Sequence, residues 1–377
     1  MSGGGAVIVA GAVARRIDRG GHVWALLQWV LGFRKLGWSV VFLDRLDPAP
    51  DVRHSPAVRA FVETMQSFGL SDSFSLDIGP HDEPIGLSRD AVRRKVGEAD
   101  LLVNVMGYLN DPAVLARARR RVFLDIDPGF GQMWRALGLC DLFGEHDAFV
   151  TVGTRVGRDD CRVPTCGLAW ITTLPPVVID HWPASAERGS SFTSVGSWRG
   201  PWGPVEYEGE RFGLRVHEFR RFAAVPRESG LDFEIALDID AEDHADATRL
   251  ADGGWRLSDP RSVSGTPDQY QRYVQTSLAE FGVAKGMYVH ARTGWVSDRT
   301  ACYLASGRPA IVQDTGLDGA LETGLGLLTF STPEEATSAV RTVHADWQRH
   351  SRAARALAVE HLDSDRVLRK LVDEAAA

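Results

Sequence analysis

The sequence lacks the long apolar runs and the cysteine framework that mark several large classes of protein. No stretch reaches the ~18 consecutive apolar residues that a membrane-spanning helix needs, and the first residues carry no basic region followed by a long apolar core. The four cysteines, Cys140, Cys161, Cys166 and Cys302, form no C-x-x-C pair, which disfavours a disulfide scaffold and a zinc site. We therefore expect a cytoplasmic protein without a transmembrane segment.

Positive charge is also scarce. The 377 residues include 42 Lys and Arg against 50 Asp and Glu, which gives a formal net charge of -8. Because affinity for a nucleic-acid backbone requires a basic surface, this balance argues against a nucleic-acid partner, while one anionic ligand in a local positive pocket remains compatible with it. The length, with 44% hydrophobic residues, suffices for two domains that each bury a core.

Short apolar runs typical of buried parallel strands recur through the first half of the chain. We expect strands over 6–10, 39–44, 101–107, 122–129 and 148–153. A helix beginning at His22 joins the first two strands, which predicts a right-handed crossover, and a short basic helix is expected from Val114 to Arg121. The first loop does not read G-x-G-x-x-G, so a dinucleotide site is disfavoured.

Polar side chains follow several of these strands, where open parallel sheets bind ligands. They are His22, Asn104, Tyr108 and Asp127. The ordinary pKa of histidine, ~6.5, suits His22 to proton abstraction, with Asp18 or Asp127 orienting its ring; a role as a helix cap is the alternative. Asp125 and Asp127 share one strand face as a D-x-D pair, but no further oxygen ligands support a metal, so contact of Asp127 with an acceptor is preferred.

A proline-marked and then polar segment over 174–191 is the best candidate for an interdomain linker. It predicts a first domain over 1–180 and a second over 190–355. The amphipathic end of the chain, 356–377, is expected to form a helix that packs back on the first domain.

The run from Gly294 to Gly316 reads as a loop, a short helix, a turn and a strand. Ser297 or Asp298 can cap the helix start, while Gly307 and Pro309 end it. Because a helix N-terminus favours an anion, this pattern predicts a phosphate seat, with a purely structural helix cap as the alternative.

Cationic and hydroxyl side chains gather around this helix start. Arg299 and the Ser297 and Thr300 hydroxyls supply phosphate-type donors, and Lys285 and Arg292 come from the preceding segment. Three cations that converge on one helix N-terminus indicate a diphosphate.

The run resembles the diphosphate-binding segment in the C-terminal domain of GT-B fold glycosyltransferases, where a glycine turn leads into a short helix ending in an Ala-Ser-Gly-x-Pro type turn and a strand. The resemblance implies an α/β fold of two facing Rossmann-like doubly wound domains with a cleft between them. With the cations above, the expected donor-binding residues are Arg199, Lys285, Arg292, Gly294, Ser297, Asp298, Arg299, Thr300, Gln313, Asp314, Thr315 and Gly316. Trp255 is placed near the nucleotide base, with burial in the core as the alternative. The sequence departs from the family at Cys302, where many members carry a ribose-contacting Glu.

The resemblance also implies an activity: transfer of a sugar from a nucleoside-diphosphate sugar, the co-substrate, to a hydroxyl of a small-molecule acceptor such as a natural product, with no metal and no other cofactor. His22 occupies the place of the histidine that deprotonates the acceptor in UDP-glycosyltransferase type enzymes, and Asn104 and Tyr108 are expected acceptor contacts. A nucleotide-sugar 2-epimerase of the same fold and a non-catalytic nucleotide-sugar-binding protein are the alternatives.

Overall fold

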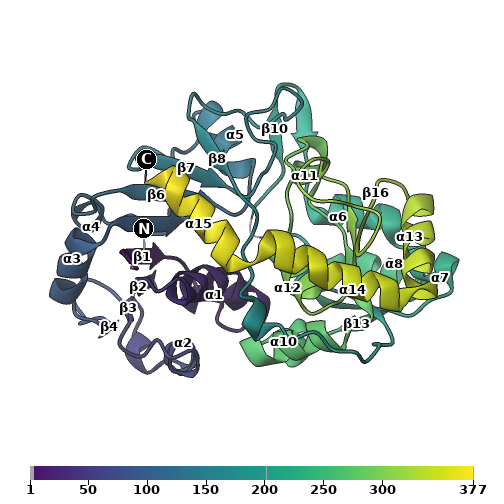
Figure 1. Ribbon diagram of the computed structural model, residues 1–377, viewed down its shortest axis with the longest axis horizontal. Helices are drawn as coiled ribbons and strands as arrows, with labels where there is room; N and C mark the ends of the chain where they lie inside the picture. The colour runs from purple at the N-terminus through teal and green to yellow at the C-terminus, as the bar shows by residue number, and fades with distance from the viewer. Residues whose placement is uncertain (1–3, 201, 377) are drawn as a thin grey trace.

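Two sheets of mostly parallel strands organise the chain (Figure 1). The structure is a computed structural model that describes residues 4–200 and 202–376. The first sheet has eight strands in the order β4-β3-β2-β1-β5-β6-β7-β8. They are β1 (Ala6–Ala10), β2 (Ser39–Arg45), β3 (Phe74–Asp77), β4 (Ile85–Gly86), β5 (Leu101–Val105), β6 (Arg121–Asp125), β7 (Ala148–Thr151) and β8 (Trp170–Thr172). Strand β4 pairs antiparallel with β3, and the other neighbours are parallel.

Strands β1, β2, β5, β6 and β7 of the first sheet form where the apolar runs predicted them, whereas β3, β4 and β8 were not predicted. Val7 of β1 lies beside Val40 of β2 and Leu101 of β5, so the central strand has apolar neighbours on both sides. Its helices are α1 (Gly20–Lys35), α2 (Pro56–Ser67), α3 (Arg89–Glu98), α4 (Pro112–Leu115) and α5 (Phe130–Ala136), with a 3-10 turn η1 (Ala14–Arg16) before α1. The predicted basic helix from Val114 to Arg121 is wrong, because Arg121 is already extended and pairs with Leu102 in the sheet.

The second sheet has six parallel strands in the order β13-β12-β9-β14-β15-β16. They are β9 (Phe192–Ser197), β12 (Phe233–Asp238), β13 (Trp255–Ser258), β14 (Ala279–Gly282), β15 (Ala310–Gln313) and β16 (Leu327–Phe330), beside a hairpin of β10 (Val205–Tyr207) and β11 (Glu210–Phe212). Its helices are α6 (Arg215–Phe219), α7 (Val225–Ser229), α8 (His244–Asp252), α9 (Pro260–Ser264), α10 (Pro267–Thr276), α11 (Gly286–His290), α12 (Asp298–Ala305) and α13 (Pro333–Ala345).

Helix α12 begins and ends where its sequence signals lie. The Ser297 hydroxyl accepts the backbone N–H of Arg299 at 3.1 Å, which satisfies one of the otherwise unpaired donors of the first turn. Gly307 follows the helix at φ +67°, a conformation that glycine adopts without strain. The helix start therefore lies where the sequence predicted it.

The chain ends in two helices that connect the domains, drawn in yellow in Figure 1. Helix α14 (Trp347–Leu357) lies on the second domain and is followed by a π-helical turn, η6 (Ala358–Leu362), and by α15 (Ser364–Ala375). Helix α15 packs against α1, closely enough that a Cβ at Gly32 would lie 2.6 Å from Leu368. None of the helices in 4–200 and 202–376 is both long and apolar enough to cross a membrane.

Candidate functional site

A cavity of about 780 Å³ lies between the two domains. Residues that follow β1 and β6 line it from the first domain, and residues that follow β9, β12, β13 and β14 line it from the second. Parallel sheets bind ligands at this edge, so the cavity, called the cleft below, is the candidate site. The predicted site residues that line the cleft are His22, Tyr108, Asp127, Arg199, Lys285, Ser297, Asp298 and Arg299.

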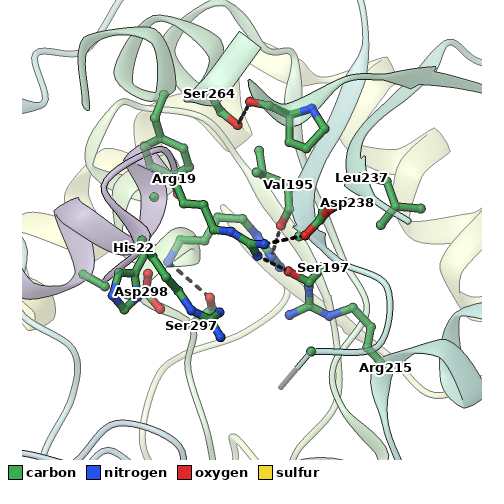
Figure 2. Close-up of a pocket in the computed structure, with 18 of the residues that line it drawn as sticks. Arg19, His22, Val195, Ser197, Arg215, Leu237, Asp238, Ser264, Ser297 and Asp298 are labelled. Carbon is green, nitrogen blue, oxygen red and sulfur yellow. Dashed lines mark hydrogen bonds and ion pairs between the residues drawn. The ribbon is translucent and has the colours of Figure 1, made fainter. Parts of the chain in front are cut away.

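His22 lies in the first turn of α1 and faces the cleft (Figure 2). Its Nε2 atom is 2.7 Å from the carbonyl oxygen of Ala12. Because a carbonyl oxygen only accepts hydrogen bonds, Nε2 carries the proton, and in the neutral ring Nδ1 keeps a free lone pair. Burial lowers the pKa of His22, and the neighbouring Arg16 and Arg19 lower it further. The imidazole is therefore a neutral base at pH 7.

Asp127 joins the domains instead of orienting His22. Its carboxylate accepts bonds from Lys285 Nζ at 2.7 and 2.9 Å and from the Tyr288 hydroxyl. The other predicted partner, Asp18, lies 3.6 Å from Arg261. The prediction that a carboxylate orients His22 is thus corrected, since the Ala12 carbonyl holds the ring. The charge of Lys285, predicted to face a diphosphate, is balanced by Asp127.

Arg299 is turned into the core of the second domain. It is 7% exposed, and it donates from Nε to Glu280 at 2.6 Å and from Nη1 to the Val195 carbonyl at 2.7 Å. Burial acts to lower the pKa of Arg299, but the Glu280 carboxylate outweighs it and raises that pKa above its ordinary value. Arg299 thus links α12 to β14 and β9, and its predicted role as the principal phosphate cation is corrected.

We expect Arg299→Ala to destabilise the fold by about 3–5 kcal/mol, because it leaves the Glu280 carboxylate buried without a cation. Urea unfolding followed by circular dichroism measures the change. The control is Arg93→Ala, which removes an exposed pair with Asp90 and should cost less than about 1 kcal/mol. Equal costs in the two variants would contradict a structural role for Arg299.

The glycine turn of the predicted phosphate motif packs against the first domain and lies outside the cleft. A Cβ at Gly294 would lie 2.3 Å from Thr154 Oγ1 and 2.8 Å from Arg155, so the turn needs glycine for this close approach. Arg292 lies beside Asp160 and Asp318, each at 3.6 Å. Neither predicted donor contact lines the cleft. Thr154 and Arg155 belong to the loop between β7 and β8, so this loop packs against the turn.

The last residue of β15 and the residues that follow it also lie outside the cleft. Gln313 donates to Glu218 at 2.7 Å, and Thr315 donates to the Trp295 carbonyl at 2.8 Å. Asp314 accepts the N–H of Gly316 at 2.8 Å and so closes its own turn. Thr300 is 1% exposed. These predicted donor contacts are therefore occupied by structural hydrogen bonds or buried.

Two further predicted contacts belong to the core. Trp255 is 4% exposed and donates to the Ala223 carbonyl at 3.0 Å. It is therefore a buried core residue, as the alternative had it, and the predicted contact with the nucleotide base is wrong. Asn104 is fully buried and forms hydrogen bonds with the backbone of Leu109 and with His146, which removes it from the acceptor surface.

Arg215, which sequence reasoning missed, faces the cleft from the first residue of α6. Its guanidinium lies over Gly196 at the end of β9, where a Cβ would be 2.0 Å from Nη1. Among the residues that the structure describes, the side chain has no hydrogen-bond or ion-pair partner, and its Nε is buried. Burial lowers the pKa of Arg215 to about 10, and the nearby Arg299 contributes. A half-buried cation without a partner is costly, so an anionic ligand would be favoured beside it.

Arg19 crosses the cleft from the first domain. It donates to the Ser197 hydroxyl at 2.7 Å and to Asp238 at 2.6 Å, at the ends of β9 and β12 (Figure 2). Sequence reasoning missed Arg19 as well, because its partners lie far away in the chain. Arg199 lines the same side of the cleft and is paired with Asp243.

Asp298 brings a negative charge to the cleft at the first position of α12. Its carboxylate accepts no hydrogen bond from another residue in the described part of the chain, and burial raises its pKa. A carboxylate there repels a phosphate and occupies the positive end of the helix. The predicted contact between Asp298 and the diphosphate is therefore disfavoured.

The described residues contain no cluster of three or more His, Cys, Asp or Glu side chains placed to hold a metal ion. Asp125 of the D-x-D pair is 2% exposed and accepts bonds from Gln132 at 2.7 Å and Thr151 at 2.9 Å. Its carboxylate is thus a buried structural group.

Comparison with known proteins identifies the fold. No protein-family model and no curated protein matches the sequence. An alpha-glucosyltransferase solved with UDP-glucose and DNA is similar at a TM-score of 0.60, with 12% identity over 99% of each chain. HepE of Anabaena with UDP and glucose gives 0.57, with 12% identity over 98% of this chain and 99% of that one. Sucrose-phosphate synthase of Thermosynechococcus elongatus gives 0.56, with 8% identity over 98% of each chain. These likenesses confirm the predicted GT-B fold.

The same comparison overturns the prediction that nucleic acid is excluded. Alpha-glucosyltransferase structures with this fold contain 13-mer DNA. The net charge of -8 is a property of the whole chain, whereas contact with a phosphate backbone depends on the local surface. At the cleft that surface includes Arg15, Arg16 and Arg19.

Proposed function

We propose that this chain is a glycosyltransferase that moves a sugar from a nucleoside-diphosphate sugar to a hydroxyl group of an acceptor. The observation that carries the proposal is Arg215, a half-buried and unpartnered cation in the cleft of a GT-B fold, with the neutral His22 in the same cleft. UDP or UDP-glucose in several similar structures supports a donor of this class.

In this proposal the second domain holds the donor. The diphosphate lies in the cleft beside the Arg215 guanidinium, near the end of β9, where Arg215 neutralises its charge and stabilises the leaving group. Fixed cations can carry this charge without a resident metal. His22 takes the acceptor proton through Nδ1 as the hydroxyl attacks the anomeric carbon.

A panel of nucleotide sugars, each incubated with and without acceptors, tests the proposal. The acceptors are simple alcohols and 13-mer DNA that carries a hydroxymethylated base. Nucleotide release that depends on an acceptor supports transfer. Isomerisation without an acceptor would show an epimerase, and binding without turnover would show a binding protein, so either result contradicts transfer.

Asp298 is proposed to bind hydroxyls of the donor sugar, because a carboxylate accepts hydrogen bonds from neutral hydroxyl groups and repels phosphates. We expect Asp298→Asn to lower kcat/KM for the nucleotide sugar about tenfold, while affinity for the nucleoside diphosphate stays the same or tightens. Steady-state kinetics and calorimetric titration measure the two quantities. The control is Asp18→Asn, at an exposed cleft residue. A tenfold loss of nucleoside diphosphate affinity in Asp298→Asn would instead place this side chain in the phosphate seat.

A further inference from the structure

A second cavity, of about 320 Å³, lies within the first domain at the carboxyl ends of β1, β2 and β3, beside α3. Leu43 and Val92 give it an apolar wall. It shares Ala12, Arg15 and Tyr108 with the cleft, so the two cavities adjoin. Its size falls in the range of small-ligand pockets.

Four arginines line this second cavity, and three of them have weak or neutral partners. They are Arg15, Arg45, Arg89 and Arg93. Arg45 donates to the amide oxygen of Asn110 at 2.7 Å and pairs with no carboxylate among the described residues. Arg15 and Arg93 pair with Asp47 and Asp90 at exposed positions, where ion pairs contribute little. Their N–H donors are available to a ligand at small cost.

The carboxylates that line the second cavity already accept hydrogen bonds from the protein. Asp44 accepts the N–H groups of Ala14 at 2.8 Å and of Arg45 at 2.6 Å, and burial raises the pKa of Asp44 to about 7. Asp111 caps the start of α4 through Oδ1, and Asp77 accepts Arg89 at 3.0 Å. A cationic ligand would therefore contact carboxylates that already accept hydrogen bonds from the protein. An anion would instead contact arginine side chains that still have free N–H groups.

We infer that the second cavity binds a phosphate group carried by the acceptor, with Arg45 as its principal contact. Phosphate fits better than a carboxylate because its greater charge and additional oxygens engage several guanidinium groups at once. The inference rests on the proposed function, because it takes the ligand that carries the phosphate to be the acceptor of the sugar transfer. The phosphate belongs either to the backbone of a nucleic acid or to a free phosphorylated compound.

Ala12 connects this phosphate site to the proposed chemistry. The residue lines both cavities, and its carbonyl oxygen holds His22 Nε2 at 2.7 Å. A ligand anchored at Arg45 can extend past Tyr108 into the cleft. The phosphate then fixes the acceptor while its hydroxyl reaches the base, which is how binding remote from the reacting atoms promotes transfer.

Calorimetric titration of the protein saturated with UDP tests this site. UDP occupies the proposed donor site, so the added probes report on the second cavity. The probes are phenyl phosphate, phenylacetate, benzyl alcohol and a 13-mer DNA duplex. We expect phenyl phosphate to bind more tightly than phenylacetate, and benzyl alcohol not to bind measurably. Arg45→Gln should weaken phenyl phosphate about tenfold, because it removes charge-assisted hydrogen bonds. DNA binding with the same dependence on Arg45 identifies a phosphodiester as the source, and binding of phenyl phosphate without DNA identifies a free phosphate ester.

The control is Arg94→Gln, an exposed arginine of α3 that lines neither cavity. Equal affinities of the Arg45 and Arg94 variants for phenyl phosphate would overturn the inference, as would tighter binding of phenylacetate. The outcome is separable from the proposed function. If UDP does not bind, the donor assignment fails, and the phosphate site is still tested by the difference between the two variants in the unliganded protein.

Discussion

Replacing His22 with alanine should lower kcat for sugar transfer at least about 100-fold, with less than a twofold change in affinity for the nucleoside diphosphate. A general base acts on the proton that leaves the acceptor in the transition state, whereas in our proposal the diphosphate is held from the second domain. Single-turnover kinetics measures the loss, and calorimetric titration measures the affinity. The control is His146→Ala, a partly buried histidine of the first domain that lines neither cavity.

The pH profile separates a base from a packing residue. Burial holds the pKa of His22 below its ordinary value of 6.5, so the active neutral form predominates at pH 7 and above. We expect kcat/KM to be level above pH 7 and to fall tenfold per pH unit below the pKa of His22. In His22→Ala the remaining kcat/KM should no longer fall in this way at acidic pH. An unchanged fall, or full retained activity, would remove His22 from the mechanism.

The sequence predicts the sheets because apolar runs dictate burial. Strand β1 has the predicted bounds, Ala6–Ala10, since it is a short apolar run that ends directly before a glycine. Short polar segments are harder to predict. The stretch 116–120 shows neither apolar periodicity nor a cap, so its lack of helix becomes clear only from the strand pairing of Arg121 with Leu102.

The sequence predicted where the site lies and several of the residues that line it, but not the contacts that those residues make. Asp298 and Arg299 are adjacent on α12, where successive side chains point about 100° apart. Both line the cleft, but the Arg299 guanidinium is bound to Glu280 in the core, whereas the Asp298 carboxylate remains open to the cleft. Glu280 was the available signal, because an acidic residue in an apolar strand requires a buried cation. Nothing local singles out Arg215, since its position over Gly196 arises only from folding.

Replacing Arg215 with methionine should weaken nucleoside diphosphate binding about 100-fold and stabilise the unliganded protein by about 1 kcal/mol. The two effects have one cause. A half-buried guanidinium without a partner destabilises the empty protein, and the same lack of a partner makes it a strong ligand for an anion. Methionine keeps the apolar stem and removes both the cost and the attraction. Calorimetric titration with UDP and urea unfolding measure the two changes.

Arg220→Met is the matched control, because Arg220 directly follows the same helix but pairs with Asp246 at 2.7 Å and lies outside the cleft. It should lose stability and keep its affinity for UDP, the opposite of Arg215→Met on both measurements. Bound ligand adds RT ln(1 + [L]/Kd) to stability, so UDP at 100 times the wild-type Kd should stabilise the wild type by about 2.7 kcal/mol. At that UDP concentration Arg215→Met should gain only about 0.4 kcal/mol. An equal gain in both proteins would show that the diphosphate is held elsewhere, and the donor assignment would then fail.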